Sequence, residues 1–116
     1  MMKFGTMYKQ GEIITIPFPF TDLTIVKQRP ALIISKNQYN EKTEDIIVCG
    51  ITSNLKNSEF SVLIDNKNLV EGKIPTKSRI KVDKIYTLRK NMIRNKIARV
   101  DQETFNKIKE EFHSLI

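Results

Sequence analysis

Residues 13–35 read IITIPFPFTDLTIVKQRPALIIS, and this stretch decides the fold. Residues 13–16 and 31–34 are two short apolar runs rich in β-branched side chains, which is typical of buried strands. Pro17 and Pro19 cannot donate backbone hydrogen bonds, so the first strand must end, bend or lie at a sheet edge where they begin. We therefore expect two strands joined by a loop that contains prolines.

Further strands are expected at residues 46–51, 60–65, 79–83 and 96–100, which are apolar runs or alternate between apolar and polar side chains. The alternation slips at Asp83 and Lys84, which indicates a bulge or a bend. Residues 37–45 read as a polar connection, and residues 89–95 fit either a helical turn or a loop.

The end of the chain has the pattern of an amphipathic helix. Asp101 is of a type favoured at helix N-caps, and Glu103 falls in the first turn, where the helix dipole favours negative charge. One apolar stripe follows at helical spacing: Phe105, Ile108, Phe112 and Leu115. Five to six short strands and one late helix predict a mostly β fold, a small antiparallel barrel with a C-terminal α-helix. We expect one domain over residues 1–116, with residues 1–10 as a leader segment.

Positive charge is concentrated in one part of the chain. The net charge is +7, and residues 73–99 contain ten basic residues against one acidic residue, Asp83. The rest of the chain has ten basic and twelve acidic residues. A basic block beside a near-neutral remainder is typical of a surface that binds nucleic acid, and the alternative is an ordinary soluble basic surface.

Several kinds of site lack support in the sequence. Cys49 is the one cysteine, so an internal disulfide is excluded, and its apolar neighbours favour a small buried side chain over a nucleophile. His113 is the one histidine, and without clustered Cys, His or carboxylate residues we expect no metal and no cofactor. No apolar stretch approaches a membrane span and the N-terminus lacks an apolar signal core, so we expect a cytoplasmic protein without a membrane partner.

Cations lie just before the second strand, in the segment Lys27-Gln28-Arg29-Pro30. Because proline disfavours the α region for the residue before it, Arg29 starts from a restricted, extended backbone. Its guanidinium offers paired donors in a plane and stays charged, which suits a phosphate group. An arginine on a solvated surface is the alternative interpretation.

Two other segments carry groups that can contact nucleic acid. Phe18 and Phe20 alternate with prolines, and they can stack on unpaired bases or pack inward beneath the loop. Small polar side chains follow the strand expected at residues 46–51: Thr52, Ser53 and Asn54.

Six short motifs occur in a fixed order along the chain. They are GEII at 11–14, PFPFTD at 17–22, KQRPAL at 27–32, VCGITS at 48–53, VDKIYTL at 82–88 and IRNKI at 93–97. With these motifs the sequence resembles the PemK/MazF family, the toxin half of bacterial toxin–antitoxin pairs, from residue 11 to the end. Each motif alone is weak evidence, and their joint occurrence is specific.

The resemblance implies an SH3-like barrel that forms a homodimer and acts as a metal-independent endoribonuclease on single-stranded RNA at a preferred short sequence. It also implies neutralisation by a cognate antitoxin, and we expect the complex with that antitoxin to bind DNA. A basic groove lined by apolar edges can accept an acidic, disordered antitoxin tail, which would cover Arg29 and compete with RNA. The arginine before proline matches Arg29, and the threonine after the third strand matches Thr52; both are regarded as active-site residues in the family. In the loop, Thr24, Ile25 and Val26 replace a glycine-containing segment common in relatives, so the preferred RNA sequence does not transfer.

The chemistry of these residue types agrees with that activity. Without a metal, the 2′-hydroxyl of RNA can attack the adjacent phosphorus, which leaves a 2′,3′-cyclic phosphate and a 5′-hydroxyl. Arg29 can donate charge-assisted hydrogen bonds to the phosphate oxygens, and Thr52 can add a neutral hydroxyl donor. Arginine is a poor general base because its pKa exceeds 12, so its contribution is expected to be electrostatic.

A third catalytic candidate is Asp83. In one branch of the family an arginine and an aspartate two residues apart on the fifth strand take part in proton transfer, and the matching residues here are Lys81 and Asp83. Nearby cations would keep Asp83 ionised and able to accept a proton. A structural salt bridge or a carboxylate that stabilises the bulge is the alternative. We expect further RNA contacts from Phe18, Lys27, Gln28, Ser53, Asn54, Lys81 and Lys84.

Two other functions remain open from the sequence. A related toxin family of similar architecture, CcdB-like, binds DNA gyrase and does not cut RNA. A catalytically inactive relative would bind RNA in a salt-sensitive manner without cleaving it.

Overall fold

A computed structural model describes residues 7–19 and 26–116, with residues 18, 19, 26 and 27 described by their backbone alone. The strands are β1 (Glu12–Pro19), β2 (Val26–Ile33), β3 (Asp45–Thr52), β4 (Ser61–Ile64), β5 (Leu69–Gly72), β6 (Ser78–Arg89) and β7 (Asn95–Val100). The helices are α1 (Asn37–Lys42) and α2 (Gln102–Leu115), with the short 3-10 turns η1 (Asn66–Asn68) and η2 (Lys90–Met92).

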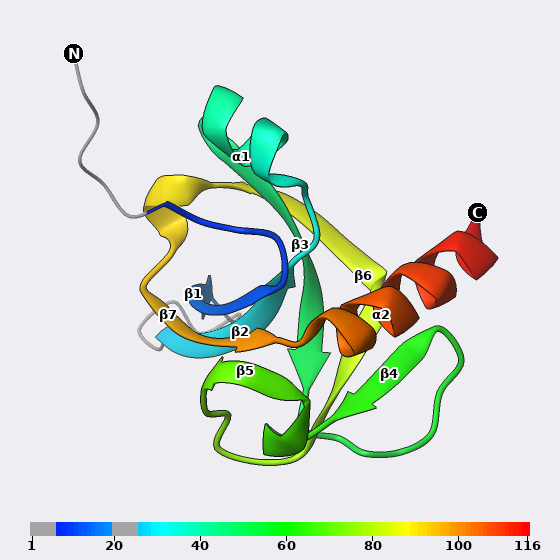
Figure 1. The fold of residues 1–116 in the computed structure, drawn as a ribbon. Coiled ribbons are helices and arrows are strands. Elements are labelled where there is room, and N and C mark those ends of the chain that lie inside the picture. Colours follow the sequence, from blue (N-terminus) through cyan, green and yellow to red (C-terminus); the bar gives the residue numbers. More distant parts are fainter. Residues whose placement is uncertain (1–6, 20–25) are drawn as a thin grey trace.

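Within the described residues the seven strands form one antiparallel sheet in the order β4-β6-β3-β2-β1-β7-β5. The sheet curls so that its two edge strands, β4 and β5, approach the same end of the molecule (Figure 1). Helix α2 packs against β6 and β4 and crosses the side of the curled sheet. The expected class, a small antiparallel β barrel with a C-terminal helix, is confirmed.

Two elements were not expected. Strand β5 adds a seventh strand, whereas five to six were expected, and α1 lies within the connection read as polar, residues 37–45. Helix α1 is held by a buried side chain rather than by a cap or an apolar stripe. Asn40 Nδ2 donates to the carbonyl oxygens of Tyr8 and Ser35, while Ser35 Oγ donates to Asn40 Oδ1.

The prolines of β1 lie at a free edge, one of the three outcomes expected for them. Strand β1 pairs with β7 from Glu12 to Thr15 and with β2 from Ile13 to Pro19. Beyond Thr15, β1 pairs only with β2 among the described residues. On its other side no described strand needs a hydrogen bond from β1, so proline, which lacks a backbone N–H, is tolerated there.

Buried side chains cover both faces of the sheet. The larger cluster includes Leu32, Cys49, Ile80 and residues of α2, and the smaller cluster includes Ala31, Ile33 and Val48. Because strand side chains alternate between faces, the two clusters mark the two faces of β2 and β3. The apolar stripe of α2 is buried at Phe105 and Ile108 and reaches solvent at Leu115.

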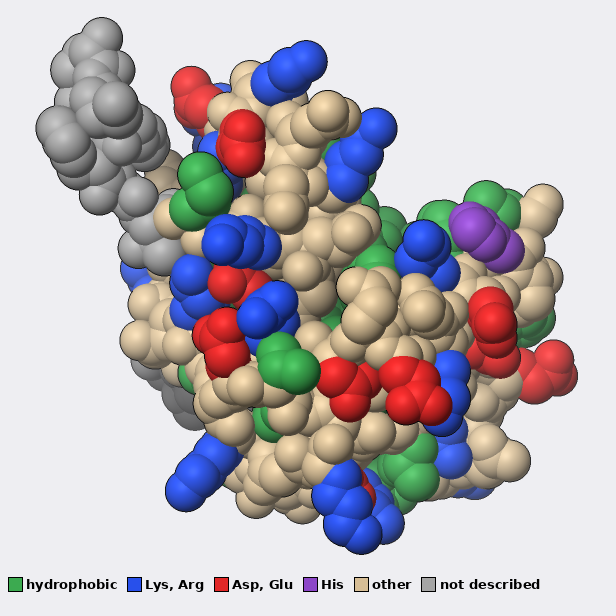
Figure 2. Space-filling model, viewed as in Figure 1, with side chains coloured by type: hydrophobic (Ala, Val, Ile, Leu, Met, Phe, Trp, Pro, Cys, Tyr) green, Lys and Arg blue, Asp and Glu red, His purple; other side chains and the backbone are tan. Residues whose placement is uncertain are grey.

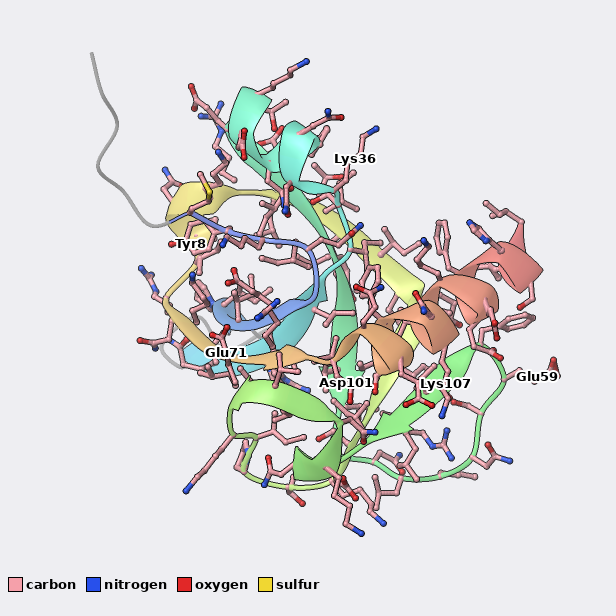
Figure 3. All side chains as sticks on the ribbon, viewed as in Figure 1. Tyr8, Lys36, Glu59, Glu71, Asp101 and Lys107 are labelled. Atoms are coloured by element: carbon pink, nitrogen blue, oxygen red, sulfur yellow. The ribbon has the colours of Figure 1, made fainter. Side chains whose placement is uncertain are left out.

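Asp101 caps α2, as expected. Its side chain accepts a hydrogen bond from the Thr104 backbone N–H at 2.7 Å. Hydrogen bonding from the side chain and the backbone of Thr104 lowers the pKa of Asp101, with a smaller effect of Lys107. Figure 3 shows Asp101 at the start of α2 and Lys107 along the helix. A carboxylate at this end also interacts favourably with the helix dipole.

Cys49 is fully buried in the larger cluster, which confirms the expectation of a small buried side chain. Burial raises the pKa of its thiol to about 12, because an apolar site disfavours the thiolate. The folded chain therefore holds this proton more tightly than the unfolded chain, and stability is lost as pH rises from the ordinary thiol pKa toward 12.

We expect Cys49 to resist a thiol reagent at pH 8 in the folded protein, with on the order of a thousandfold less thiolate than an ordinary cysteine. Mass spectrometry after iodoacetamide treatment measures this, and the same treatment in denaturant is the positive control. Complete labelling within minutes in native buffer would contradict it.

Candidate active site

A bulge in β6 brings two lysines to the same point of the sheet. Lys81 pairs with Gly50 of β3 on one side of the bulge, and Ile85 pairs with Cys49 on the other. Residues 82–84 are therefore extra residues opposite one step of β3. A Cβ built on Gly50 would lie 3.7 Å from the Cβ of Lys84, so both lysines flank this glycine. The bulge expected from the slip in alternation is confirmed.

A groove of about 500 Å³ lies over this point. Its lining comes from the end of β3, the loop between β3 and β4, and β6 on both sides of the bulge. Four of the predicted site residues line it: Thr52, Asn54, Lys81 and Lys84. The groove thus combines a hydroxyl, an amide and two cations, a set that suits an anionic ligand with hydrogen-bonding groups.

Basic side chains hold the loop between β3 and β4 in place. Lys81 Nζ donates a hydrogen bond to Ser58 Oγ at 3.1 Å. Arg79 donates from Nη1 to Ser61 Oγ at 3.0 Å and from Nε to the Leu55 carbonyl oxygen at 3.3 Å. The loop wall of the groove is therefore fixed from two positions on β6.

The Thr52 side chain has a defined orientation at the end of β3. Its Oγ1 accepts a hydrogen bond from the Asn54 backbone N–H at 3.1 Å, and the residue is half-buried. Because the loop uses Thr52 Oγ1 as an acceptor, its hydroxyl proton can be donated to a ligand in the groove.

Arg29 lies on the same face of the sheet as Thr52. Strand β2 pairs with β3 as far as Ala31 and Gly50, and continuing this register by two residues sets Arg29 opposite Thr52. The Arg29 side chain is exposed and lies outside the groove lining. By this register Arg29 lies on β2 beside the end of β3 that carries Thr52.

Besides Arg29, three further predicted site residues lie outside the groove. Asp83 is exposed in the bulge and forms no hydrogen bond or ion pair with the described part of the chain, so a bulge-stabilising ion pair is not observed. Ser53 is exposed beside Thr52. Gln28 is exposed and, by alternation, lies on the opposite face of β2 from Arg29.

Phe18 and Lys27 pair with each other across β1 and β2. Their side chains lie outside the described residues, as do Phe20 and the loop residues Thr24 and Ile25. The role of Phe18 and Lys27 in RNA contact stays a prediction.

Some cations of the basic block, residues 73–99, form ion pairs, and others line the groove. Among the described residues, three ion pairs join it to acidic side chains: Arg89 with Glu44, Lys96 with Glu12 and Arg99 with Glu71. Figure 2 shows basic and acidic side chains interspersed over β7 and α2. Lys81 and Lys84 form no ion pair with the described acids, so two cations of the block without an acidic partner line the groove.

The site residues predicted from the sequence did not include Asn57, Arg79 or Tyr86, which shape the groove. Tyr86 follows the bulge by two residues, and Arg79 precedes it by three. The slip in alternation at Asp83 and Lys84 was the one sequence signal for Tyr86. A bulge at this point places the residues before and after it opposite adjacent residues of β3.

Two further observations on the described residues concern metal ions and membranes. No group of three or more His, Cys, Asp or Glu side chains is placed there to hold a metal ion. No helix within residues 7–19 and 26–116 is long and apolar enough to cross a membrane.

Solved toxin structures share this fold. A MazE–MazF complex from Deinococcus radiodurans has a TM-score of 0.77 at 21% identity and covers 96% of each chain. An endoribonuclease from a mycobacterial species has a TM-score of 0.75 at 22% identity and covers 97% of this chain and 93% of that chain. A mycobacterial endoribonuclease in complex with its cognate antitoxin has a TM-score of 0.74 at 20% identity and covers 92% of each chain.

In sequence, no curated protein matches this chain significantly. The model of one protein family matches residues 9–116, and its members are PemK-like, MazF-like toxins of type II toxin–antitoxin systems. The match spans every described strand and helix, and of the described residues it leaves out only the first two, 7 and 8. This chain therefore belongs to the PemK-like, MazF-like toxin family of type II toxin–antitoxin systems.

Proposed function

We propose that this chain is a metal-independent endoribonuclease that cleaves single-stranded RNA at a preferred sequence and thereby stops translation and growth. The observation that carries the proposal is the common face of Arg29 and Thr52 beside a groove lined by two lysines that form no ion pair with the described acids. Family membership and the endoribonucleases of the same fold support it.

In the proposed reaction the RNA 2′-oxygen attacks the adjacent phosphorus. The new 2′-O–P bond forms and the P–O5′ bond breaks, which gives a 2′,3′-cyclic phosphate and a 5′-hydroxyl. The 2′-hydroxyl loses its proton, and the leaving 5′-oxygen gains one. Arg29 and Thr52 donate hydrogen bonds to the non-bridging oxygens, where negative charge grows in the transition state. Lys81 and Lys84 bind neighbouring phosphates, and Asp83 is the candidate for accepting a proton.

The test is cleavage of a long unstructured RNA by the purified protein in excess EDTA, with the product ends sequenced. Thr52→Ala is expected to cut about a hundredfold more slowly, because one donor to the transition state is lost. Thr52→Ser keeps the hydroxyl and is the matched control, expected to retain most of the rate. An RNA left intact by well-folded wild type would refute the nuclease and favour a protein-binding toxin or an inactive relative.

Asp83→Asn is run in the same assay. A proton acceptor in the transition state typically contributes on the order of a hundredfold, so a large loss with a changed pH profile supports Asp83. A rate within twofold of the wild type removes Asp83 from the mechanism.

We further propose a homodimer whose partner is an antitoxin with an acidic, disordered tail. The unpaired lysines of the groove favour an acidic segment, and two solved relatives are complexes with an antitoxin. The tail would compete with RNA for the groove. Unchanged RNA binding at saturating antitoxin would contradict this competition.

A further inference from the structure

The groove contains an aromatic ring, and none of the proposed cleavage steps uses this ring. Tyr86 is 42% exposed and lines the groove. Its Cε2 lies 3.8 Å from the place that a Cβ on Gly50 would occupy. Because Gly50 has no side chain, the space beside the Tyr86 ring stays open at the floor of the groove.

The loop wall of the same groove carries two amide side chains, from Asn54 and Asn57. Asn54 Oδ1 accepts from the Lys56 backbone N–H at 3.0 Å, which leaves the amide NH₂ of Asn54 to donate. Asn57 is exposed, and its amide forms no hydrogen bond with the described residues. An amide offers a donor and an acceptor side by side, which matches the edge of a nucleobase.

This wall is arranged before any ligand binds. Arg79 and Lys81 fix the loop through Leu55, which directly follows Asn54, and through Ser58, which directly follows Asn57. A preordered loop loses little conformational entropy when it binds, so it can discriminate between ligands of similar shape. The volume of about 500 Å³ lies in the range of sites for small molecules, roughly 300–1,000 Å³.

We propose that the groove holds one unpaired nucleobase of RNA, stacked on Tyr86 and recognised at its edge by Asn54 and Asn57. Lys84 and Lys56, which also line the groove, bind the phosphates on either side of that nucleotide. The inference rests on the proposed function, and it assigns the sequence preference at one position of the RNA to this pocket. Stacking on an aromatic ring tolerates every base, so the amides supply the preference.

The first test compares Tyr86→Ala with Tyr86→Phe by cleavage of a randomised RNA pool, with the ends sequenced. Tyr86→Ala is expected to lower cleavage by roughly 5- to 150-fold, the range that loss of one base–aromatic stack gives. Tyr86→Phe keeps the ring and is expected to stay within about twofold. Equal losses in the two variants would overturn stacking, because the hydroxyl would then be the active group.

Asn57→Ala tests recognition in the same pool. It is expected to flatten the base preference at one position by at least about fivefold and to leave the other positions unchanged. Tyr39→Ala, on α1 and outside the groove lining, is the control for aromatic truncation, with its melting temperature measured first. An unchanged base preference in Asn57→Ala would overturn the recognition assigned to its amide.

A binding experiment separates failure of this pocket from failure of the nuclease. A 2′-deoxy oligonucleotide, which cannot form the cyclic phosphate, carries 2-aminopurine at each position in turn, and stacking quenches its fluorescence. Quenching at one position by wild type and Tyr86→Phe but not by Tyr86→Ala supports the pocket even when no RNA is cut. Equal quenching by wild type and Tyr86→Ala would overturn the pocket, whether or not wild type cleaves RNA.

Discussion

Replacement of Arg29 by alanine is expected to slow RNA cleavage by about a hundredfold to a thousandfold. The proposed role of its guanidinium is to donate hydrogen bonds to phosphate oxygens as they gain charge, and charge-assisted bonds are about twice as strong as neutral ones. Arg29→Lys keeps the charge but loses the planar pair of donors, so it should recover a minor part of the rate. Single-turnover cleavage in EDTA measures the chemical step directly.

Arg89→Ala is the matched control for this loss of charge. Arg89 pairs with Asp45 at the opposite end of β3 from Thr52, and its ion pair with Glu44 is exposed. Such a pair contributes about 1 kcal/mol or less, so the variant should fold and cut normally. Equal cleavage rates for Arg29→Ala and wild type would contradict the catalytic role and leave Arg29 a structural or partner-binding role. If Arg29→Ala has a lowered melting temperature, its loss of cleavage is attributed to folding.

Gly72→Ala is expected to destabilise the protein by about 2 kcal/mol or more, which corresponds to roughly 8 °C in melting temperature. Gly72 has a φ of +72°, and a Cβ there would lie 2.0 Å from the Ile97 carbonyl oxygen and 2.7 Å from the Ala98 Cα. Both atoms belong to the backbone of β7, so the clash is relieved only by moving β5 off its neighbour. Urea unfolding followed by circular dichroism measures the change.

The other two described glycines, Gly11 and Gly50, give a graded comparison. Gly11 has a φ of +92°, but a Cβ there meets side chains at 3.7 Å or more, so Gly11→Ala carries the backbone strain without the clash. Gly50→Ala carries neither, because its nearest atoms lie 3.7 and 3.8 Å away. We expect stability to fall in the order Gly50→Ala, Gly11→Ala, Gly72→Ala, and a different order would contradict the steric argument.

The sequence predicted the elements whose stability comes from their own residues. The strands β1, β2 and β3 contain apolar β-branched runs, and α2 has an N-cap and an apolar stripe, so local pattern and tertiary packing agree. Helix α1 lacks both signals, because Asn40 is held by contacts with residues as distant as Tyr8. Strand β5 has four residues and a register shift, and its pairing with β7 carries no periodic signal.

The candidate site could be predicted only in part, for a related reason. Arg29 and Thr52 were recognised through the motifs around them, and pairing of β2 with β3 then explains why they share a face. The position of Tyr86 depends on how many residues the bulge inserts in β6, which sequence alternation indicates but does not count. The brace from Arg79 to Leu55 joins residues 24 apart in the chain and has no local signature.

The two prolines of β1 also bear on how the toxin behaves at high concentration. A strand with an unpaired edge offers N–H and C=O groups to a strand of another molecule, which is a common route to aggregation. Pro17 and Pro19 are two residues apart, so both missing N–H groups belong to the same side of β1, and pairing with β2 on the other side is retained. At residues 17 and 19 the open part of β1 therefore offers no backbone N–H to a strand of another molecule, which weakens this route to aggregation.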